Sequence, residues 1–415
     1  MTGVDVSRAR SIVVAVVLAA AGCGLPGDPG LAFGVDSPWP QPSLLPPVTG
    51  PRLAVTNSGD DTLSFIDPES FEEIARIPIG RNPAELEGPH HLAASPDGRT
   101  LFVGISNTVP VNASGPHGNH GTGTADGYLV SVDALTGRQL DWVRVHRSPG
   151  DIRLEPGGRR IWQSHYDLVT IAEVLKQGQG NLSYDQFLAK MDSPLVITDA
   201  RTMERVAELR ICPAGHGISF DGARRRAVVT CGFSDQVALV DLDSFDVRRI
   251  FVAPDPGEPP VPRYEPYAVA VDPTGRIWVS ATGRGRLGLR VLDPESGKEI
   301  PDLRIPTDGI PLFGSFLADG SRYYVVTQKP DRLLAIDPEL GSVDSEIDLA
   351  PMGCLNAHAA VLSPDEASIW IVCEGDHLVQ PGSIERLDRA TLEPTGHVAV
   401  GLYPDDVIYV PHGEP

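Results

Sequence analysis

The chain has 415 residues, of which 55 are Asp or Glu and 34 are Lys or Arg, giving a formal net charge of −21. This excess of negative charge repels phosphate groups, so a nucleic-acid partner is excluded. The length alone would allow two or three domains, but the internal repeat described below predicts one.

The first 22 residues have the pattern of an export signal. Arg8 and Arg10 precede an apolar stretch at 12–21, which is followed by Gly22 and Cys23. A basic start, a short apolar core and small residues before a break are typical of a signal peptide. Residues 18–23 also resemble a bacterial lipobox, in which Cys23 is acylated; an ordinary signal peptide with an incidental cysteine is the alternative. We expect an exported protein, anchored through Cys23 to a bacterial membrane and facing the periplasm or the cell exterior.

Residues 23–50 are predicted to be a tether. Between positions 24 and 50 there are seven prolines and five glycines, with almost no strand pattern. Such a segment cannot bury enough apolar surface to order itself, and its prolines keep it extended.

Seven short apolar runs along the rest of the chain end in aspartate. These aspartates are Asp67, Asp133, Asp199, Asp241, Asp293, Asp337 and Asp388. Apolar runs of strand length, bounded by turns such as Ser-Pro-Asp-Gly at 95–98, predict repeated four-stranded antiparallel sheets around an axis. We expect each aspartate to accept backbone N–H groups in the turn that follows it.

The C-terminal segment completes the first repeat. Residues 52–80 contain three strands where the other units have four, and residues 404–413 align without gaps on residues 89–98. The last strand is therefore predicted to join the first unit, which leaves no free sheet edge. We predict that residues 51–415 form an all-β, seven-bladed β-propeller closed by the C-terminal strand in blade 1.

Short motifs in these strands resemble a known family. Residues 54–62 (Ala-Val-Thr-Asn-Ser-Gly-Asp-Asp-Thr), 228–231 (Val-Val-Thr-Cys) and 324–327 (Tyr-Val-Val-Thr), with the Ser-Pro-Asp-Gly turns, are similar to the YVTN-type seven-bladed β-propellers of exported bacterial proteins. The resemblance covers residues 50–413. Such propellers serve as lactonases, cofactor-bearing oxidoreductases and binding scaffolds, so the resemblance implies a fold and leaves the activity open.

Four cysteines besides Cys23 are predicted to form two disulfides, as is usual in an exported chain. The repeat selects Cys212–Cys231 and Cys354–Cys373, because both pairs are 19 residues apart and join the outer strand of one blade to the second strand of the next. Cys231 lies 12 residues after Ser219, whereas Cys373 lies 10 after Ser363. We expect a longer hairpin at residues 223–226 to absorb this difference.

The residue that begins each inner strand, a proline in most blades, serves as an alignment mark for the channel mouth. In blade order, the next position holds Asp405, His90, Gly150, Ala214, Tyr267, Leu312 and His358. The position after it holds Asp406, His91, Asp151, Gly215, Ala268, Phe313 and Ala359. The polar residues thus come from blades 7, 1, 2 and 3, and blades 4 to 6 offer mostly small, aromatic or apolar groups.

This alignment predicts a metal site at the mouth. The candidate ligands are His90, His91, His358, Asp151, Asp405 and Asp406, with His165 expected on the same face. Imidazole and carboxylate groups suit Cu, Zn or Fe, and they also suit a general base held by a carboxylate. A water-filled polar lining is the structural alternative. A Cys/His metal site using the Cys-x-x-x-His spacing at 212–216 and 354–358 is disfavoured, because the cysteines have partners.

Two insertions lie on the same face. Residues 110–126 include His117 and His120 in a Gly-rich loop, and residues 168–193 predict two short helices at 168–176 and 184–191. Long loops in a compact fold are usually lids or binding elements.

Three functional hypotheses remain open. The first is a lipid-anchored propeller that binds a partner protein or small-molecule ligand on its loop-rich face. The second is a metal- or cofactor-dependent oxidoreductase; the His90-His91 dipeptide resembles the copper propeller of nitrous oxide reductase, and a haem d1 ligand would need one histidine. The third is a lactonase-like hydrolase, which would need a carboxylate-rich calcium site.

Overall fold

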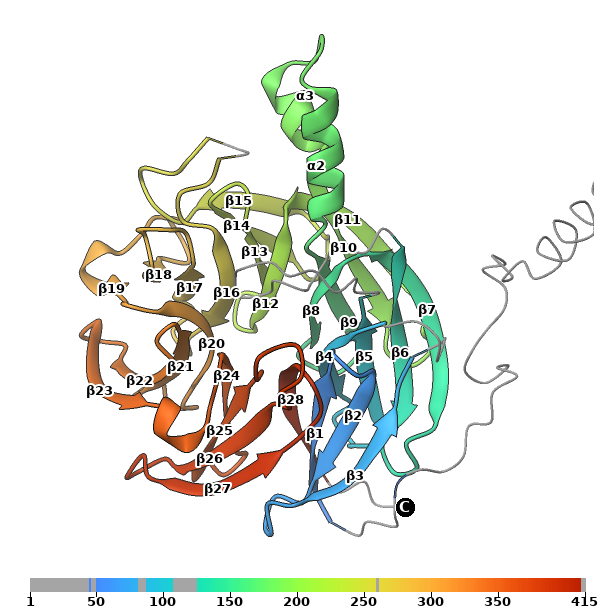
Figure 1. Cartoon of the computed structure of the whole chain (residues 1–415). Coiled ribbons are helices and arrows are strands. Elements are labelled where there is room, and N and C mark those ends of the chain that lie inside the picture. The colour runs from blue at the N-terminus through green and yellow to red at the C-terminus, as the bar shows by residue number, and fades with distance from the viewer. Residues whose placement is uncertain (1–44, 46–49, 81–86, 107–124, 259–260, 412–415) are drawn as a thin grey trace, which may run out of the picture.

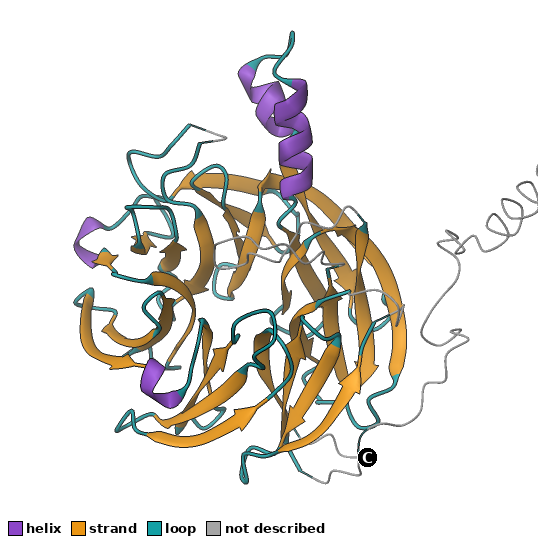
Figure 2. Ribbon diagram, viewed as in Figure 1, coloured by secondary structure: helices purple, strands orange, loops and turns teal. Residues whose placement is uncertain are grey.

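A computed structural model of the chain describes residues 45, 50–80, 87–106, 125–258 and 261–411. Most of these residues lie in strands, and the sheets are arranged radially around a central axis (Figures 1 and 2). Within the described ranges there are five four-stranded sheets and one eight-stranded sheet. The prediction of an all-β chain built from repeated four-stranded units is confirmed.

The first three sheets follow the chain from the N-terminal side. The first contains β28 (Pro404–Val410), β1 (Arg52–Asn57), β2 (Thr62–Ile66) and β3 (Glu73–Pro78). The second contains β4 (Pro89–Ala94), β5 (Thr100–Ile105), β6 (Asp126–Asp133) and β7 (Gln139–Arg147). The third contains β8 (Pro149–Leu154), β9 (Arg160–His165), β10 (Asp192–Asp199) and β11 (Arg205–Pro213).

The remaining sheets continue the same order. The fourth contains β12 (Gly215–Asp221), β13 (Arg226–Cys231), β14 (Gln236–Asp241) and β15 (Val247–Phe251). The fifth contains β16 (Pro266–Val271), β17 (Ile277–Ala281), β18 (Gly288–Leu292) and β19 (Ile305–Pro306). The eight-stranded sheet contains β20 (Ile310–Phe316), β21 (Tyr323–Gln328), β22 (Arg332–Asp337), β23 (Ser342–Asp348), β24 (Ala357–Leu362), β25 (Ser368–Cys373), β26 (Ser383–Asp388) and β27 (Pro394–Ala399).

The eight-stranded sheet consists of two antiparallel meanders, β20 to β23 and β24 to β27. The meanders meet through a single parallel residue pair, Phe313 with Ala359, on the two innermost strands. Each meander has the same four-strand order as the other sheets.

The last strand closes the ring as predicted. β28 pairs antiparallel with β1, from Arg52 opposite Val410 to Asn57 opposite Pro404. Because β28 is the innermost strand of the first sheet, the strand that ends the described chain also lines the channel.

The seven repeated aspartates stabilise turns, as their spacing predicted. One carboxylate oxygen of each accepts N–H bonds from the residues two and three positions later, as Asp133 does from Leu135 and Thr136, both at 2.9 Å. The same pair of bonds forms at Asp67, Asp199, Asp241, Asp293, Asp337 and Asp388.

Aliphatic side chains hold neighbouring sheets together. Leu63 and Phe65 of β2 share a fully buried cluster with Leu101 and Val103 of β5. Each such side chain contributes roughly 1.5–3 kcal/mol by leaving water. Similar clusters lie between the other sheets, and the outermost strands are exposed.

Both predicted disulfides are present. Cys212 is bonded to Cys231, with Cα atoms 5.6 Å apart, and Cys354 to Cys373, with Cα atoms 5.2 Å apart. Cys212 lies in β11 of the third sheet and is bonded to β13 of the fourth, whereas Cys354 lies in the segment before β24 and is bonded to β25. Two disulfides are typical of proteins outside the cytoplasm.

The longer hairpin expected between β12 and β13 is not there, and that prediction was wrong. Asp221 pairs with Arg226, and in the equivalent hairpin Ser363 pairs with Ser368 over the same span. Asp221, not Ser219, is therefore the counterpart of Ser363. The mismatch in cysteine spacing comes from the alignment of β12, as shown below.

Two helices are inserted between β9 and β10, as predicted. They are α2 (Leu168–Gln177) and α3 (Tyr184–Ala189), and they pack on each other and on Ala214 and Phe233 at their base. In Figure 1 this hairpin extends outward from the ring. Two 3₁₀ turns, η1 (Pro301–Leu303) and η2 (Ala350–Met352), complete the elements. None of the described helices is long and apolar enough to cross a bilayer.

Candidate metal centre at the channel mouth

The start of each inner strand is irregular, and this irregularity brings two consecutive side chains into the channel. In β4 the pairing with β5 breaks between Pro89 and Leu92, and β8 and β16 break at the same place. In a regular strand, consecutive side chains point to opposite faces, whereas a bulge lets neighbours share one. The rings of His90 and His91, which lie inside the break, are accordingly only 4.2 Å apart.

The alignment of β12 used above was wrong by two residues. Gly215 pairs with Cys231 as Pro149 pairs with His165, so Gly215 occupies the place of the strand-opening proline. Pro213 instead ends β11, and Ala214 takes a left-handed conformation with φ of 54°. His216 therefore takes the first channel position, where Ala214 was expected.

This correction places a third histidine beside His90 and His91. One ring nitrogen from each of His90, His91 and His216 lies within 4.8 Å of the others. All three side chains are buried. The ring centroid of His216 is 5.8 Å from that of His90 and 6.0 Å from that of His91. The two strands that carry them, β4 and β12, flank β8, whose own first position is Gly150.

Gly150 explains why the imidazoles can approach across β8. A Cβ at this position would lie 2.9 Å from Ser164 Oγ and 3.3 Å from the ring of His216. The glycine thus leaves the space that the histidine rings need. Its carbonyl oxygen lies 3.1 Å from Nδ1 of His90.

The hydrogen bonds of these rings fix which nitrogen faces the channel. A carbonyl oxygen can only accept, so Nδ1 of His90 carries the proton and Nε2 carries the lone pair in the neutral ring. Nδ1 of His91 lies 3.1 Å from Oδ2 of Asp406 and 3.7 Å from Oδ1 of Asp151. A carboxylate or carbonyl on one imidazole nitrogen is the arrangement that orients the other toward a metal.

His216 is held by an aromatic neighbour. Its ring stacks on that of Tyr267 at 4.0 Å, and its Nε2 lies 3.0 Å from the tyrosine hydroxyl. Tyr267 occupies the first channel position of β16. The fifth sheet, from which an aromatic group was expected, therefore takes part in the site through the tyrosine hydroxyl.

The predicted residues His358 and Asp405 lie next to the three histidines. Nδ1 of His358 is 2.6 Å from the backbone oxygen of Asp405, and Oδ1 of Asp405 is 3.8 Å from Nε2 of His90. Glu374, which the sequence did not single out, joins them: it directly follows β25, and its carboxylate is fully buried. Burial raises the pKa of Asp405 to about 7, and the nearby His90 and Ser58 oppose this rise.

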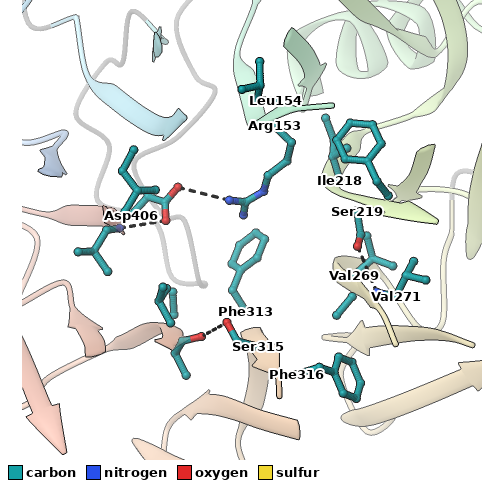
Figure 3. A pocket seen from close by; sticks show the side chains of 18 residues that line it. Arg153, Leu154, Ile218, Ser219, Val269, Val271, Phe313, Ser315, Phe316 and Asp406 are labelled. Carbon is teal, nitrogen blue, oxygen red and sulfur yellow. Dashed lines mark hydrogen bonds and ion pairs between the residues drawn. The ribbon is translucent and has the colours of Figure 1, made fainter. Parts of the chain in front are cut away.

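The two remaining predicted carboxylates face an arginine. Nε of Arg153 lies 3.1 Å from Oδ1 of Asp151. Its NH1 lies 3.8 Å from Oδ2 of Asp406, a contact that Figure 3 shows. Burial raises the pKa of Asp151 to about 6, and Arg153 opposes this rise. Burial also raises the pKa of Asp406, with Arg153 again opposing. These two aspartates therefore orient His91 while Arg153 balances their charge.

His165 is the one predicted ligand within the described chain that lies apart. Ser164 faces the channel, where its Oγ lies 3.0 Å from the backbone nitrogen of Asp151. Because side chains alternate along a strand, His165 points to the other face of β9. Its Nδ1 lies 3.1 Å from the oxygen of Pro194, and its ring is 5.7 Å from that of His146. Burial lowers the pKa of His165 to about 3.

A cavity of about 450 Å³ occupies the other end of the channel (Figure 3). Most of the lining residues are apolar and come from later positions of the inner strands, but Arg153, Asp406, Ser219 and Ser315 also line the cavity, and polar and apolar atoms share its exposed surface about equally. Phe313 lies between this cavity and the histidines, with its ring 5.2 Å from that of His91 and 5.3 Å from that of His358. Phe313 and the ion-paired Arg153 thus separate the two ends.

Four predictions fall outside the described residues. They are the signal peptide at 1–22, the acylated Cys23, the tether at 23–50 for all but residues 45 and 50, and the loop histidines His117 and His120.

No protein-family model and no curated relative matches the sequence. Solved structures do resemble it. A putative 6-phosphogluconolactonase from Bacteroides uniformis is 13% identical with a TM-score of 0.60, and the match covers 88% of this chain and 100% of that one. Dihydro-heme d1 dehydrogenase NirN is 16% identical with a TM-score of 0.52, over 92% of this chain and 79% of that one. Apo AztD from Citrobacter koseri is 15% identical with a TM-score of 0.52, over 88% and 98%. At these identities the likeness establishes the β-propeller fold alone.

Proposed function

We propose that this protein is an exported, seven-bladed β-propeller that binds a transition metal ion at the mouth of its channel. The observation that carries the proposal is the buried cluster of His90, His91 and His216, with one nitrogen from each within 4.8 Å. Buried imidazoles are costly to group together unless they share a proton, a hydrogen bond or a cation. Imidazole donors suit Cu, Zn and Fe.

The count of seven blades follows from treating the eight-stranded sheet as two blades. A single parallel residue pair joins its two meanders, whereas each meander has a full set of antiparallel ladders. The YVTN-type motifs and the closing strand agree with this count. Export and acylation at Cys23, with residues 23–50 as a tether, would hold the propeller near a membrane and leave its loop-rich face open to a partner or ligand.

The donor set bears on the two enzymatic alternatives. A calcium-dependent lactonase needs a site dominated by oxygen ligands, and here nitrogen dominates the first cluster. A metal-dependent oxidoreductase would use these same histidines. Metal binding is therefore the first property to establish.

The test is a metal titration of the purified full chain after chelation and dialysis. We expect the wild-type protein to bind at least one equivalent of Zn²⁺ or Cu²⁺ with sub-micromolar affinity in calorimetry. The variant His90→Ala/His216→Ala should bind at least 100-fold more weakly, because two of three nitrogen donors are gone. His397→Ala is the matched control, since this histidine is largely exposed and pairs with Glu385 far from the mouth.

Wild-type protein without such an affinity, or a double variant that binds as tightly as wild type, would overturn the proposal. The variants His90→Gln and His216→Gln keep the buried volume, and circular dichroism shows whether each is folded.

A further inference from the structure

A second group of metal-binding side chains adjoins the first. His358, Glu374 and Asp405 each offer a ligand atom within 4.8 Å of the others, and all three side chains are fully buried. They come from three places in the sequence: β24, the residue after β25, and β28. Only the closed ring brings them together.

Glu374 has a carboxylate oxygen that the described protein does not satisfy. Its Oε2 accepts a hydrogen bond from Nε2 of Gln328 at 3.1 Å and lies 2.5 Å from Nε2 of His377. Its Oε1 is buried and has no hydrogen-bond partner among the described residues. The nearest basic nitrogen is Nδ1 of His358, at 3.6 Å. A buried oxygen left in this state costs about 1–3 kcal/mol, so a cation, a proton or a water is expected there.

The ring of His358 is held by the backbone of β28. Since its Nδ1 lies 2.6 Å from the backbone oxygen of Asp405, that nitrogen carries the proton, and Nε2 carries the lone pair of the neutral ring. This is the same arrangement as at His90, where the carbonyl of Gly150 plays the part of the accepting oxygen.

Asp405 lies between the two groups of ligands. Its Oδ2 accepts a hydrogen bond from Ser58, and its Oδ1 faces Nε2 of His90 at 3.8 Å. The rings of His91 and His358 are 5.9 Å apart. A carboxylate oxygen of Asp405 also lies within 4.8 Å of the ligand atoms of His358 and Glu374, so this residue is within reach of both groups, as a ligand shared by two metals must be.

We propose that His358, Glu374 and Asp405 bind a second cation, so that the mouth of the channel is a two-metal site with Asp405 as the shared ligand. The first position offers three imidazoles, and the second offers one imidazole and two carboxylates. The second position therefore favours a harder divalent ion such as Mn²⁺, Fe²⁺ or Zn²⁺. This inference deepens the proposed function, but its ligands are a separate set.

The test measures binding stoichiometry in the purified, metal-free full chain with Zn²⁺ as the probe, by calorimetry and by elemental analysis after gel filtration. We expect two equivalents for wild type, one for Glu374→Gln and one for His216→Ala. Co²⁺ titration should give two visible absorption spectra, of which Glu374→Gln removes one. Glu385→Gln is the matched control, because Glu385 is also buried and paired with a histidine, His397, yet lies away from the mouth.

The outcomes separate the two proposals. A single equivalent that His216→Ala removes and Glu374→Gln leaves intact overturns the second site and supports the first. A single equivalent with the reverse pattern supports the second site and overturns the first. If wild type and Glu374→Gln both bind two equivalents, the inference is overturned. A proton or a water then accounts for the buried oxygen of Glu374. Asp405→Asn provides a second variant of the same site.

Discussion

The two ends of the channel are built from the same inner strands, yet they differ in chemistry. At the mouth, the first two positions of the strands carry buried imidazoles and carboxylates that contact one another. Further along, the same strands line a cavity of about 450 Å³ whose described lining residues are mostly aliphatic or aromatic and include no histidine, with the ion-paired Arg153 and Asp406 at the boundary. The backbone repeats around the ring, so the difference comes from side chains at the strand-opening bulges. A propeller can thus place a polar site at one end without disturbing the packing of the rest.

Covalent cross-links also distinguish the ends. Cys231 and Cys373 pair across from Gly215 and Ala357, the residues just before His216 and His358. Both disulfides therefore hold strands at the mouth, and the cavity end has none among the described residues.

Removing both disulfides should give the largest effect. Each closes a loop of 19 residues and contributes about 3 kcal/mol, so Cys212→Ala/Cys231→Ala combined with Cys354→Ala/Cys373→Ala should lower the free energy of unfolding by about 6 kcal/mol. Urea denaturation measures this loss, and Zn²⁺ affinity should fall with it. Ser315→Ala at the cavity end is the control, with an expected loss near 1 kcal/mol and unchanged affinity. Equal Zn²⁺ affinity with and without the disulfides would show that the mouth does not depend on them.

Phe313→Ala tests the separation between the ends. The ring is 7% exposed and contacts the rings of His91 and His358, so truncation should cost about 3 kcal/mol in urea denaturation. Phe316→Ala is the matched control: this ring lines the cavity and stacks on Tyr323, but it is partly exposed, so we expect a smaller loss of about 1–2 kcal/mol. If both variants lose the same free energy of unfolding, the contacts of Phe313 with the two histidines add nothing to stability.

Substituting His165 should give the smallest change in stability. It tests whether this histidine is a buried neutral group outside the metal-binding cluster of the mouth. Its pKa is about 3 in the folded chain and about 6.5 when unfolded, so the unfolded state binds more protons between these values. The contribution of His165 to stability is therefore fully present above pH 6.5, and it is lost as the pH falls toward 3. At pH 4.5 the loss from this residue should be about 2–3 kcal/mol. His165→Gln should remove that part of the acid sensitivity in urea denaturation at pH 7.5 and 4.5.

The control for His165 is His397→Gln, which should behave as wild type at both pH values. An acid sensitivity in His165→Gln equal to that of wild type would place the titrating group elsewhere.

Periodic features of this molecule could be predicted from the sequence. The aspartate-ending strands, the turns, the closing strand and both disulfides repeat at fixed spacing, so each unit supports the assignment of the next. His90, His91, His358, Asp151, Asp405 and Asp406 followed from two successive register positions, and the structure brings them together at the mouth.

Local departures from the repeat explain the errors. Pro213 looked like a strand-opening proline, but it ends β11, and this hid His216 from the alignment. The cysteine spacing of 12 against 10 residues was the available signal. Glu374 was missed because it follows a second strand, and the alignment used only the inner strands. Tyr267 was counted as an aromatic group, whereas it takes part through its hydroxyl. His165 was misplaced by one residue of strand alternation, since Ser164 is the residue that faces the channel.

The closing strand also has a kinetic consequence. Asp405 and Asp406 reach their histidine partners only when β28 docks on β1, and 315 positions separate Asp406 from His91. Contacts between such distant segments form late in folding, because the chain entropy of so large a loop must be lost first. We therefore expect Asp405 and Asp406 to join the mouth late in folding, after the sheets that carry the histidines have formed. A chain released before residue 404 lacks both the closure and two of the carboxylates, so tight metal binding would distinguish finished molecules from incomplete ones.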